Sequence, residues 1–213
     1  MSHNSTVIVD YGLGNLFSIR NALEHLGGVA EFSSDPDVVR NAERIVLPGV
    51  GAFGEGMREL KKRDLVPAIS DFVATGRPLI GICLGMQLLM SESEELGLHQ
   101  GLGLVGGRVV QFESPQDHDD RYKIPHIGWN RMERVADHEY GDVLQNLPND
   151  FFMYFVHSYY VTLDQTSDCL TETDYGRNRF CSSLQHDNVI GFQGHPERSG
   201  EAGLAVLTSF LSL

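Results

Sequence analysis

The sequence of 213 residues is poor in cysteine, in basic residues and in long apolar runs. Its three cysteines, Cys83, Cys169 and Cys181, are too few and too scattered for a disulfide framework, and their odd number fits a reducing, cytoplasmic compartment. No CxxC pair or HxxxH spacing supports a zinc site. No apolar run approaches the roughly 20 residues of a membrane span, and the first residues lack the basic segment of a secretory signal.

Acidic residues outnumber basic residues by 29 to 16, which gives a formal net charge of −13. A surface this acidic repels phosphate backbones and anionic lipids, so no nucleic acid and no membrane is expected as a partner. A small anionic substrate, or a partner protein with a basic face, is compatible with this charge. The apolar fraction of 41% suffices for a core, and the length favours a single domain over residues 1–213.

The first half of the chain alternates strand and helix signals. Short apolar runs predict strands at Val7–Val9, Val29–Phe32, Arg44–Leu47 and Pro78–Cys83. Apolar residues at helical spacing predict helices at 16–26, 55–75 and 84–90. The second of these helices is expected to break near Pro67. Such βαβ units favour parallel strands covered by helices on both faces.

The second half consists of short apolar runs separated by polar loops. They predict strands, partly antiparallel, at Leu104–Val105, Arg108–Phe112, Phe151–Val156, Tyr159–Val161 and Val189–Gln193, and a closing helix at Ala202–Leu211. A turn is expected at Thr173–Asn178, and the acidic run Asp117–Asp120 is interpreted as solvated surface rather than a metal site. The predicted fold class is α/β: one domain with a central, mostly parallel sheet, helices on both faces and a smaller antiparallel portion.

A tight turn with a cysteine at its centre follows the fourth predicted strand. Gly81, Cys83 and Gly85 form a Gly-x-Cys-x-Gly pattern between a strand and a helix, which is typical of a nucleophile elbow. The helix that follows adds positive dipole and free N–H groups, which favour a thiolate and a developing oxyanion. A lone cysteine is more often a small buried apolar residue, but the two flanking glycines favour the nucleophile.

A thiol nucleophile needs a base, and the base needs an orienting group. Among nine histidines, His195 stands out because it follows a strand and precedes a proline and Glu197. An extended backbone is expected to place His195 and Glu197 on the same side of the chain, where the carboxylate can hold the imidazole. His126 and His157, in mixed apolar and aromatic segments, are not readily explained as surface residues.

The run Gly49–Gly54 admits two interpretations. Its GxGxxG spacing after a strand is that of a dinucleotide-binding turn, but Pro48 interposes and no strand about 20 residues later ends in an acidic residue. Alternatively, the glycines expose backbone N–H groups as an oxyanion hole. We favour the oxyanion hole because Cys83 ends the next predicted strand.

Six motifs occur in the order found in one known family. They are Val9–Asn15, Pro48–Gly54, Gly81–Gln87, Pro125–Asn130, Tyr154–Tyr159 and His195–Glu197. Over essentially the whole chain, the sequence resembles the class I, triad-type glutamine amidotransferases. Within that class, Pro125–Asn130 and Tyr154–Tyr159 point to the glutaminase subunits of imidazole glycerol phosphate synthase.

The resemblance implies a role for each matched residue. It implies Cys83 as nucleophile, His195 as general acid and base, and Glu197 as its orienting carboxylate. The implied oxyanion hole consists of the backbone N–H groups of Leu84, Val50 and Gly51, the last two after a peptide flip. The residues implied to hold the α-amino and α-carboxylate groups of glutamine are Gln87, Glu95, Ser158 and Tyr159. Those implied at the partner face and ammonia passage are Trp129, Tyr154 and Arg198.

The implied activity is hydrolysis of L-glutamine to glutamate and ammonia, without cofactor or metal. The ammonia is expected to pass, shielded from water, to a (β/α)8-barrel cyclase in a heterodimer. That partner makes imidazole glycerol phosphate and an aminoimidazole carboxamide ribotide in histidine biosynthesis. Two alternatives stay open: a paralogous glutaminase that supplies ammonia for amidination of surface-polysaccharide sugars, and a free-standing cysteine hydrolase.

Three positions depart from the family pattern and slightly favour the paralogue. Gly194 stands where the family usually has Phe, so the wall behind the imidazole is expected to loosen or to admit another side chain. Arg198 stands where Lys is common, which keeps the charge but changes its geometry. The loop 113–121 is longer and more acidic than the resemblance implies.

Overall fold

The computed structural model describes residues 5–113, 122–135 and 143–213, so the acidic run Asp117–Asp120 lies outside the described residues. The strands are β1 (Ser5–Val9), β2 (Val29–Ser33), β3 (Arg44–Leu47), β4 (Leu79–Ile82), β5 (Glu92–Ser93), β6 (His99–Gln100), β7 (Gly107–Gln111), β8 (His126–Arg134), β9 (Asp150–His157), β10 (Tyr159–Leu163), β11 (Cys169–Tyr175), β12 (Asn178–His186) and β13 (Val189–Phe192). The helices are α1 (Leu16–His25), α2 (Pro36–Asn41), α3 (Phe53–Lys62), α4 (Leu65–Val73), α5 (Leu84–Leu88) and α6 (Gly200–Leu211), and the two 3-10 turns are η1 (Thr166–Asp168) and η2 (Pro196–Arg198).

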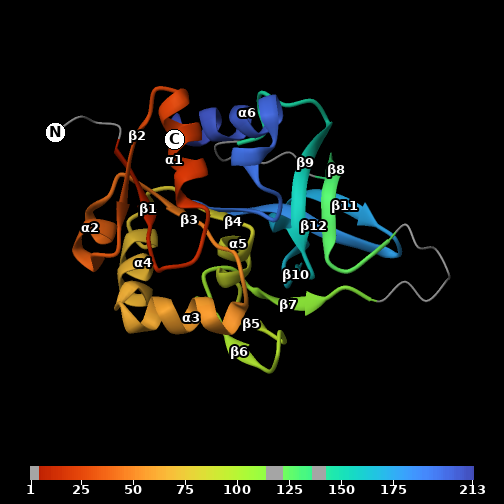
Figure 1. The fold of residues 1–213 in the computed structure, drawn as a ribbon, viewed down its shortest axis with the longest axis horizontal. Helices are drawn as coiled ribbons and strands as arrows, with labels where there is room; N and C mark the ends of the chain where they lie inside the picture. Colours follow the sequence, from red (N-terminus) through yellow and green to blue (C-terminus); the bar gives the residue numbers. More distant parts are fainter. Residues whose placement is uncertain (1–4, 114–121, 136–142) are drawn as a thin grey trace.

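The centre of the sheet is parallel, with strand order β2-β1-β3-β4-β13 (Figure 1). The pairing becomes antiparallel at β12, and the sheet continues through β10, β7, β5 and β6. A second path runs from β12 through β11 and β8 to β9. The structure therefore confirms the predicted α/β fold class, a central mostly parallel sheet with an antiparallel portion.

Alternation of side chains along the central strands creates two apolar layers. Val7 and Val9 of β1 belong to the layer that includes α3 and α4, whereas Ile8 packs in the layer with α1 and α6. Successive side chains of a strand point to opposite faces of the sheet. Both faces therefore need helices, and Figure 1 shows α1 and α6 on one face and α3, α4 and α5 on the other.

The predicted break in the helix at 55–75 is confirmed, but it lies three residues before Pro67 and not at the proline. The chain leaves α3 at Arg63, and Asp64 adopts a left-handed backbone (φ 55°) immediately before α4. Pro67 lies in the first turn of α4. Its missing N–H group breaks no hydrogen bond there, because the first N–H groups of a helix have no partner within the helix.

The turn predicted at Thr173–Asn178 is confirmed in its location but is shorter than predicted. Its ends belong to β11 and β12, and only Gly176 and Arg177 connect them. These strands lack the alternation of apolar and polar residues that predicts a strand, because several of their buried side chains are polar. The hydroxyl of Thr171, for example, is fully buried and contacts the hydroxyls of Ser182 and Ser183 at 3.0 and 2.6 Å.

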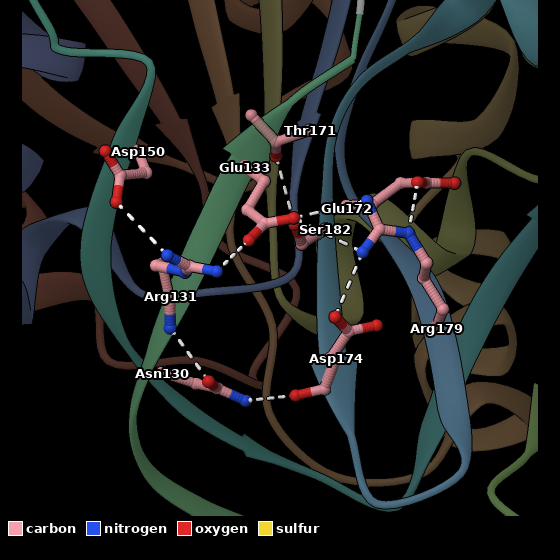
Figure 2. A network of polar contacts seen from close by, with 9 residues as sticks. All are labelled: Asn130, Arg131, Glu133, Asp150, Thr171, Glu172, Asp174, Arg179 and Ser182. Atoms are coloured by element: carbon pink, nitrogen blue, oxygen red, sulfur yellow. Dashed lines mark hydrogen bonds and ion pairs between the residues drawn. The ribbon is translucent and has the colours of Figure 1, made fainter.

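Ion pairs join the antiparallel strands, as Figure 2 shows. The Arg179 guanidinium of β12 lies 2.6 Å from the Glu172 carboxylate, 3.0 Å from that of Asp174 and 3.3 Å from that of Glu133. Arg131 of β8 also contacts Glu133. Because one cation serves three carboxylates on two neighbouring strands, we expect more stabilisation than from an isolated surface pair.

Replacing Arg179 by Met removes this cation and keeps an extended side chain. We expect Arg179→Met to lower the free energy of unfolding by about 1–2 kcal/mol, since each exposed pair contributes about 0.2–1 kcal/mol. The loss should shrink at high salt, which screens exposed charges. Arg58→Met, which breaks exposed pairs on α3, is the control and should cost less than about 0.5 kcal/mol. Urea unfolding measures both variants, and equal losses would contradict a network.

Candidate active site

Cys83 lies at the carboxyl edge of the parallel strands, directly between β4 and α5. Its backbone angles (φ 55°, ψ −111°) are unusual for a residue other than glycine. The side chain is 5% exposed and lines a cavity. A strained residue at a strand-to-helix turn is the geometry that a nucleophile elbow requires.

Two glycines allow the backbone to pack closely around Cys83. A methyl group on Gly85 would lie 1.8 Å from the carbonyl oxygen of Leu47, at the end of β3. A methyl group on Gly81 would lie 2.8 Å from the backbone of Gly85. Since no side chain fits at either position, glycine is required on both sides of Cys83.

Parallel pairing of β4 with β13 brings the histidine segment beside Cys83. Phe192 is in register with Ile82, and the Cys83 N–H group donates a 2.7 Å hydrogen bond to the Phe192 carbonyl. His195 follows three residues later and is 4% exposed. The sheet therefore places the predicted nucleophile and base together although they are far apart in the sequence.

Glu197 reaches His195 through a turn, and the extended backbone predicted for this segment is wrong. His195 Nδ1 lies 2.8 Å from Glu197 Oε1, and both side chains are buried. His195 itself is extended, but Pro196–Arg198 form the 3-10 turn η2, since the fixed φ of proline suits the start of a helical turn. The Ser199 hydroxyl donates to the His195 carbonyl at 2.6 Å and stabilises the turn.

His195 is buried next to two acidic groups. Burial disfavours its charged form, but the Cys83 sulfur and the Glu197 carboxylate outweigh this cost and raise the pKa of His195 to about 10. The charged imidazolium form of His195 is therefore favoured at neutral pH. Among the described residues, His195 Nε2 has no hydrogen-bond partner, so this nitrogen is available for proton exchange with a ligand.

A cavity of about 290 Å³ lies in front of Cys83. Eight of the predicted site residues line it: Cys83, Leu84, Val50, Gly51, Gln87, Glu95, Ser158 and Tyr159. The other lining residues are Pro125, Val156 and His157. The cavity is small and carries a carboxylate, an amide and backbone groups, which suits a small polar ligand.

Gln193 contacts the nucleophile, and the sequence motifs do not reveal it. Its Nε2 atom lies 3.8 Å from Cys83 Sγ, and its Oε1 atom accepts a 3.0 Å hydrogen bond from Gln87 Nε2. Gln87 Nε2 also donates to the Tyr159 carbonyl at 2.9 Å. The available signal was the position of Gln193 at the end of the strand that leads to His195.

His126 and His157 form a buried pair beside the cavity. His126 Nδ1 lies 3.2 Å from His157 Nε2, and His157 Nδ1 donates to the Tyr159 carbonyl at 2.8 Å. Burial lowers the pKa of His126 to about 4. Burial and the neighbouring His126 and His195 lower the pKa of His157 to about 3. Both rings are therefore neutral at pH 7, and each proton position is fixed by its acceptor.

The space next to Gly194 is filled by other side chains. A methyl group on Gly194 would lie 3.0 Å from Met153 Cβ and 3.5 Å from Phe155 Cζ. Both of those side chains are fully buried. The sequence predicts either a looser wall behind the imidazole or another side chain in place of the missing ring. The structure shows the second, because Met153 and Phe155 pack against Gly194.

The residues predicted at the partner face lie together: Trp129 and Tyr154 on the β8–β9 pair, and Arg198 in η2 beside them. Trp129 is in register with Tyr154, their ring centres are 6.3 Å apart, and the Arg198 guanidinium lies 4.8 Å from the Tyr154 ring centre. The Tyr154 carbonyl accepts the His195 N–H at 2.9 Å, and the Tyr154 N–H donates to Ser199 Oγ at 3.0 Å. This face is therefore bonded directly to the segment that carries His195.

Comparison with known proteins agrees with this geometry. The family model of the class-I glutamine amidotransferases matches residues 7–212, and the chain belongs to this family. Imidazole glycerol phosphate synthase subunit HisH of Symbiobacterium thermophilum is 47% identical over 96% of this chain and 92% of its own. The HisH subunit of Sulfurimonas denitrificans is 43% identical over 95% of each chain. Within the class, the chain is therefore of the HisH type.

Solved structures share the fold at low sequence identity. The structure of PurLQS from Thermotoga maritima has a TM-score of 0.76 at 20% identity and covers 98% of each chain. The glutaminase domain of CTPS from Trypanosoma brucei has a TM-score of 0.65 at 15% identity, over 98% of this chain and 94% of its own. Among the described helices, none has the length and apolar character needed to span a membrane.

The raised pKa of His195 gives a direct test of the cysteine–histidine pair. Cys83→Ala removes the sulfur that helps to raise this pKa, so burial is then opposed by Glu197 alone, and the pKa of His195 should fall from about 10 by at least about 2. Titration of the His195 ring signals by NMR measures the change. Cys181→Ala, which removes another buried thiol, should leave the midpoint unchanged. The same midpoint in wild type and Cys83→Ala would contradict the pair.

The neutral histidine pair predicts sensitivity to acid. Because both pKa values lie below the ordinary 6.5, the pair stabilises the fold above pH 6.5 and this stabilisation is lost as the pH falls toward 4 and 3. When the pH is lowered from 7 to 5, the free energy of unfolding should fall by about 2 kcal/mol for each of the two histidines. His126→Phe should reduce the loss by that amount, whereas His25→Phe, at the exposed end of α1, should not. Urea unfolding at pH 7 and at pH 5 measures this difference. If His126→Phe loses as much free energy of unfolding as the wild type, His126 is not the neutral, buried group described here.

Proposed function

We propose that this chain is a glutaminase subunit that hydrolyses glutamine to glutamate and ammonia and delivers the ammonia to the cyclase of imidazole glycerol phosphate synthase. The observation that carries the proposal is that two paired strands, β4 and β13, bring a strained cysteine, Cys83, close to a buried histidine, His195, whose Nδ1 faces Glu197. Similarity to HisH subunits over 95–96% of the chain supports the choice of histidine biosynthesis. The three unpaired cysteines support a cytoplasmic location.

The first half of the reaction forms a thioester. The Cys83 thiolate attacks the carboxamide carbon of glutamine, and the backbone N–H groups of Leu84 and of the Val50–Gly51 segment stabilise the tetrahedral oxyanion. His195 gives the proton on Nε2 to the leaving nitrogen, and ammonia departs. A γ-glutamyl thioester on Cys83 remains.

The second half of the reaction releases glutamate. His195, now neutral, takes a proton from water, and the resulting hydroxide attacks the thioester carbon. The same N–H groups hold the second oxyanion, and its collapse expels the Cys83 thiolate and glutamic acid. Glu197 keeps a proton on His195 Nδ1 throughout, so that Nε2 remains the nitrogen that exchanges protons.

The cavity supplies groups for both charged ends of glutamine. Glu95 is the carboxylate available to the α-ammonium group, and Gln87 lines the same cavity. The backbone at Ser158 and Tyr159 is available to the α-carboxylate. Gln87 is held in place by its hydrogen bonds to Gln193 and to the Tyr159 carbonyl, which fixes the geometry before substrate binds.

An exposed apolar face on β8 and β9 supports docking of the cyclase partner. Ile127, Trp129 and Phe152 are 58%, 57% and 55% exposed, and the pairing of the two strands places them on one face. A cluster of this kind marks a protein interface. The partner is a (β/α)8 barrel that forms a heterodimer with this chain, with Arg198 at the interface next to Tyr154.

Docking at this face explains how hydrolysis is coupled to ammonia use. Near pH 7, bulk water converts most ammonia to ammonium, which is not a nucleophile, so the product has to pass along the interface shielded from solvent. The Tyr154 backbone bonds both His195 and Ser199. A shift of the strand under a bound partner therefore acts on the catalytic histidine, and the isolated chain is expected to turn over glutamine slowly.

Glutamate release from glutamine tests the proposed function. The assay compares the chain alone, the chain with the cyclase, and the complex with an analogue of the cyclase substrate. We expect a rate near zero for the chain alone, a rise by orders of magnitude in the liganded complex, and no activity in Cys83→Ala. Cys181→Ala, a buried thiol outside the cavity, is the matched control and should retain the activity.

Two results would contradict the proposal. Absence of stimulation by the cyclase, with both proteins folded, would point to another acceptor for the ammonia. Full activity of the isolated chain would favour a free-standing hydrolase.

A further inference from the structure

A buried tyrosine holds the first peptide of the loop that carries the proposed oxyanion hole. The Tyr11 hydroxyl donates a 2.6 Å hydrogen bond to the Pro48 carbonyl, and Tyr11 is 0% exposed. Burial raises the pKa of Tyr11, and the neighbouring Cys83 raises it further. The phenol therefore stays protonated and remains a hydrogen-bond donor next to the nucleophile.

The loop is tightly packed at its start and open at its centre. A methyl group on Gly49 would lie 2.4 Å from Tyr11 Oη and 2.8 Å from Leu84 Cβ. By contrast, Val50 is 42% exposed, and a methyl group on Gly51 (φ 107°) would meet nothing within 4 Å. The peptides around Val50 and Gly51 thus have room to rotate, whereas the Pro48–Gly49 peptide does not.

A second contact holds the far end of the loop. The Glu95 carboxylate accepts a 2.6 Å hydrogen bond from the N–H group of Phe53, the first residue of α3. Hydrogen bonds to ionised acceptors are shorter and stronger than neutral ones. Residues 49–52 are therefore held at both ends, and only their centre is free.

We propose that Tyr11 is a positioning residue of the glutaminase reaction; this proposal rests on the proposed function. Its hydroxyl fixes the Pro48–Gly49 peptide, so that rotation is confined to the peptides around Val50 and Gly51 and their N–H groups face the developing oxyanion. Donors stabilise an oxyanion only when they are aimed before the charge develops. Since the α-ammonium and α-carboxylate groups bind elsewhere in the cavity, loss of the hydroxyl lowers kcat rather than raising KM.

Tyr11→Phe tests this role, because it keeps the ring and removes only the hydroxyl. Glutamate release is measured in the complex with the cyclase, in the presence of the analogue of the cyclase substrate. We expect kcat to fall at least about tenfold while KM changes by less than about threefold. The pH midpoint for alkylation of Cys83 by iodoacetamide should stay the same, since the substitution leaves His195 and Glu197 in place.

Thr171→Val is the matched control. It also removes a fully buried hydroxyl with hydrogen bonds to neighbouring side chains, but on β11 and outside the cavity. It should leave kcat unchanged even if it lowers the melting temperature. The Gly51 amide signal in 15N NMR spectra should shift or broaden in Tyr11→Phe and not in Thr171→Val.

Several results would overturn the role of Tyr11. They are an unchanged kcat in folded Tyr11→Phe, an equal fall of kcat in Thr171→Val, and a shifted alkylation midpoint, which would mean that Tyr11 acts on the thiol. Inactive wild-type complex would instead refute the proposed function. In that case the Gly51 amide signal still decides whether Tyr11 orders the loop.

Discussion

The close approach of Gly85 to the Leu47 carbonyl, where a methyl group would lie 1.8 Å away, sets the position of α5 against the end of β3. With α5 held there, the residue between β4 and α5 has to adopt a positive φ, and that residue is Cys83 (φ 55°). Such strain costs on the order of 1–3 kcal/mol and persists only when the surroundings enforce it. The surroundings here are the two glycines and the hydrogen bond from Cys83 to Phe192.

The order of the strands in the sheet brings the other parts of the site next to Cys83. β3, β4 and β13 are neighbours, so the oxyanion loop after β3, the cysteine after β4 and the histidine after β13 meet at one edge. Their side chains are then fixed from the antiparallel portion, because the Tyr154 backbone holds the His195 segment and the Tyr159 carbonyl holds Gln87. One sheet thus carries the chemistry on its parallel strands and the proposed partner face on β8 and β9.

The sequence predicts those parts that depend on local spacing. The glycines around Cys83 indicate the turn, and the apolar runs indicate the central strands. The amide of Gln193 against Cys83 depends on a distant contact and is not predictable in this way. The helix break at Asp64 and the 3-10 turn after His195 are local, but no residue pattern specifies a left-handed backbone at Asp64, and Pro196 is compatible with both a turn and an extended chain. The strands β11 and β12 escape prediction because their buried hydroxyls are paired across strands, so that apolar alternation no longer marks the buried face.

The proposed chemistry depends on a thioester between Cys83 and glutamine. Acid quenching of the complex during turnover, followed by mass spectrometry of the peptide that contains Cys83, detects this intermediate directly. We expect a mass increase of one γ-glutamyl group on that peptide, present with glutamine and absent with glutamate. Glutamine turnover by the complex with no modified cysteine at any quench time would contradict it.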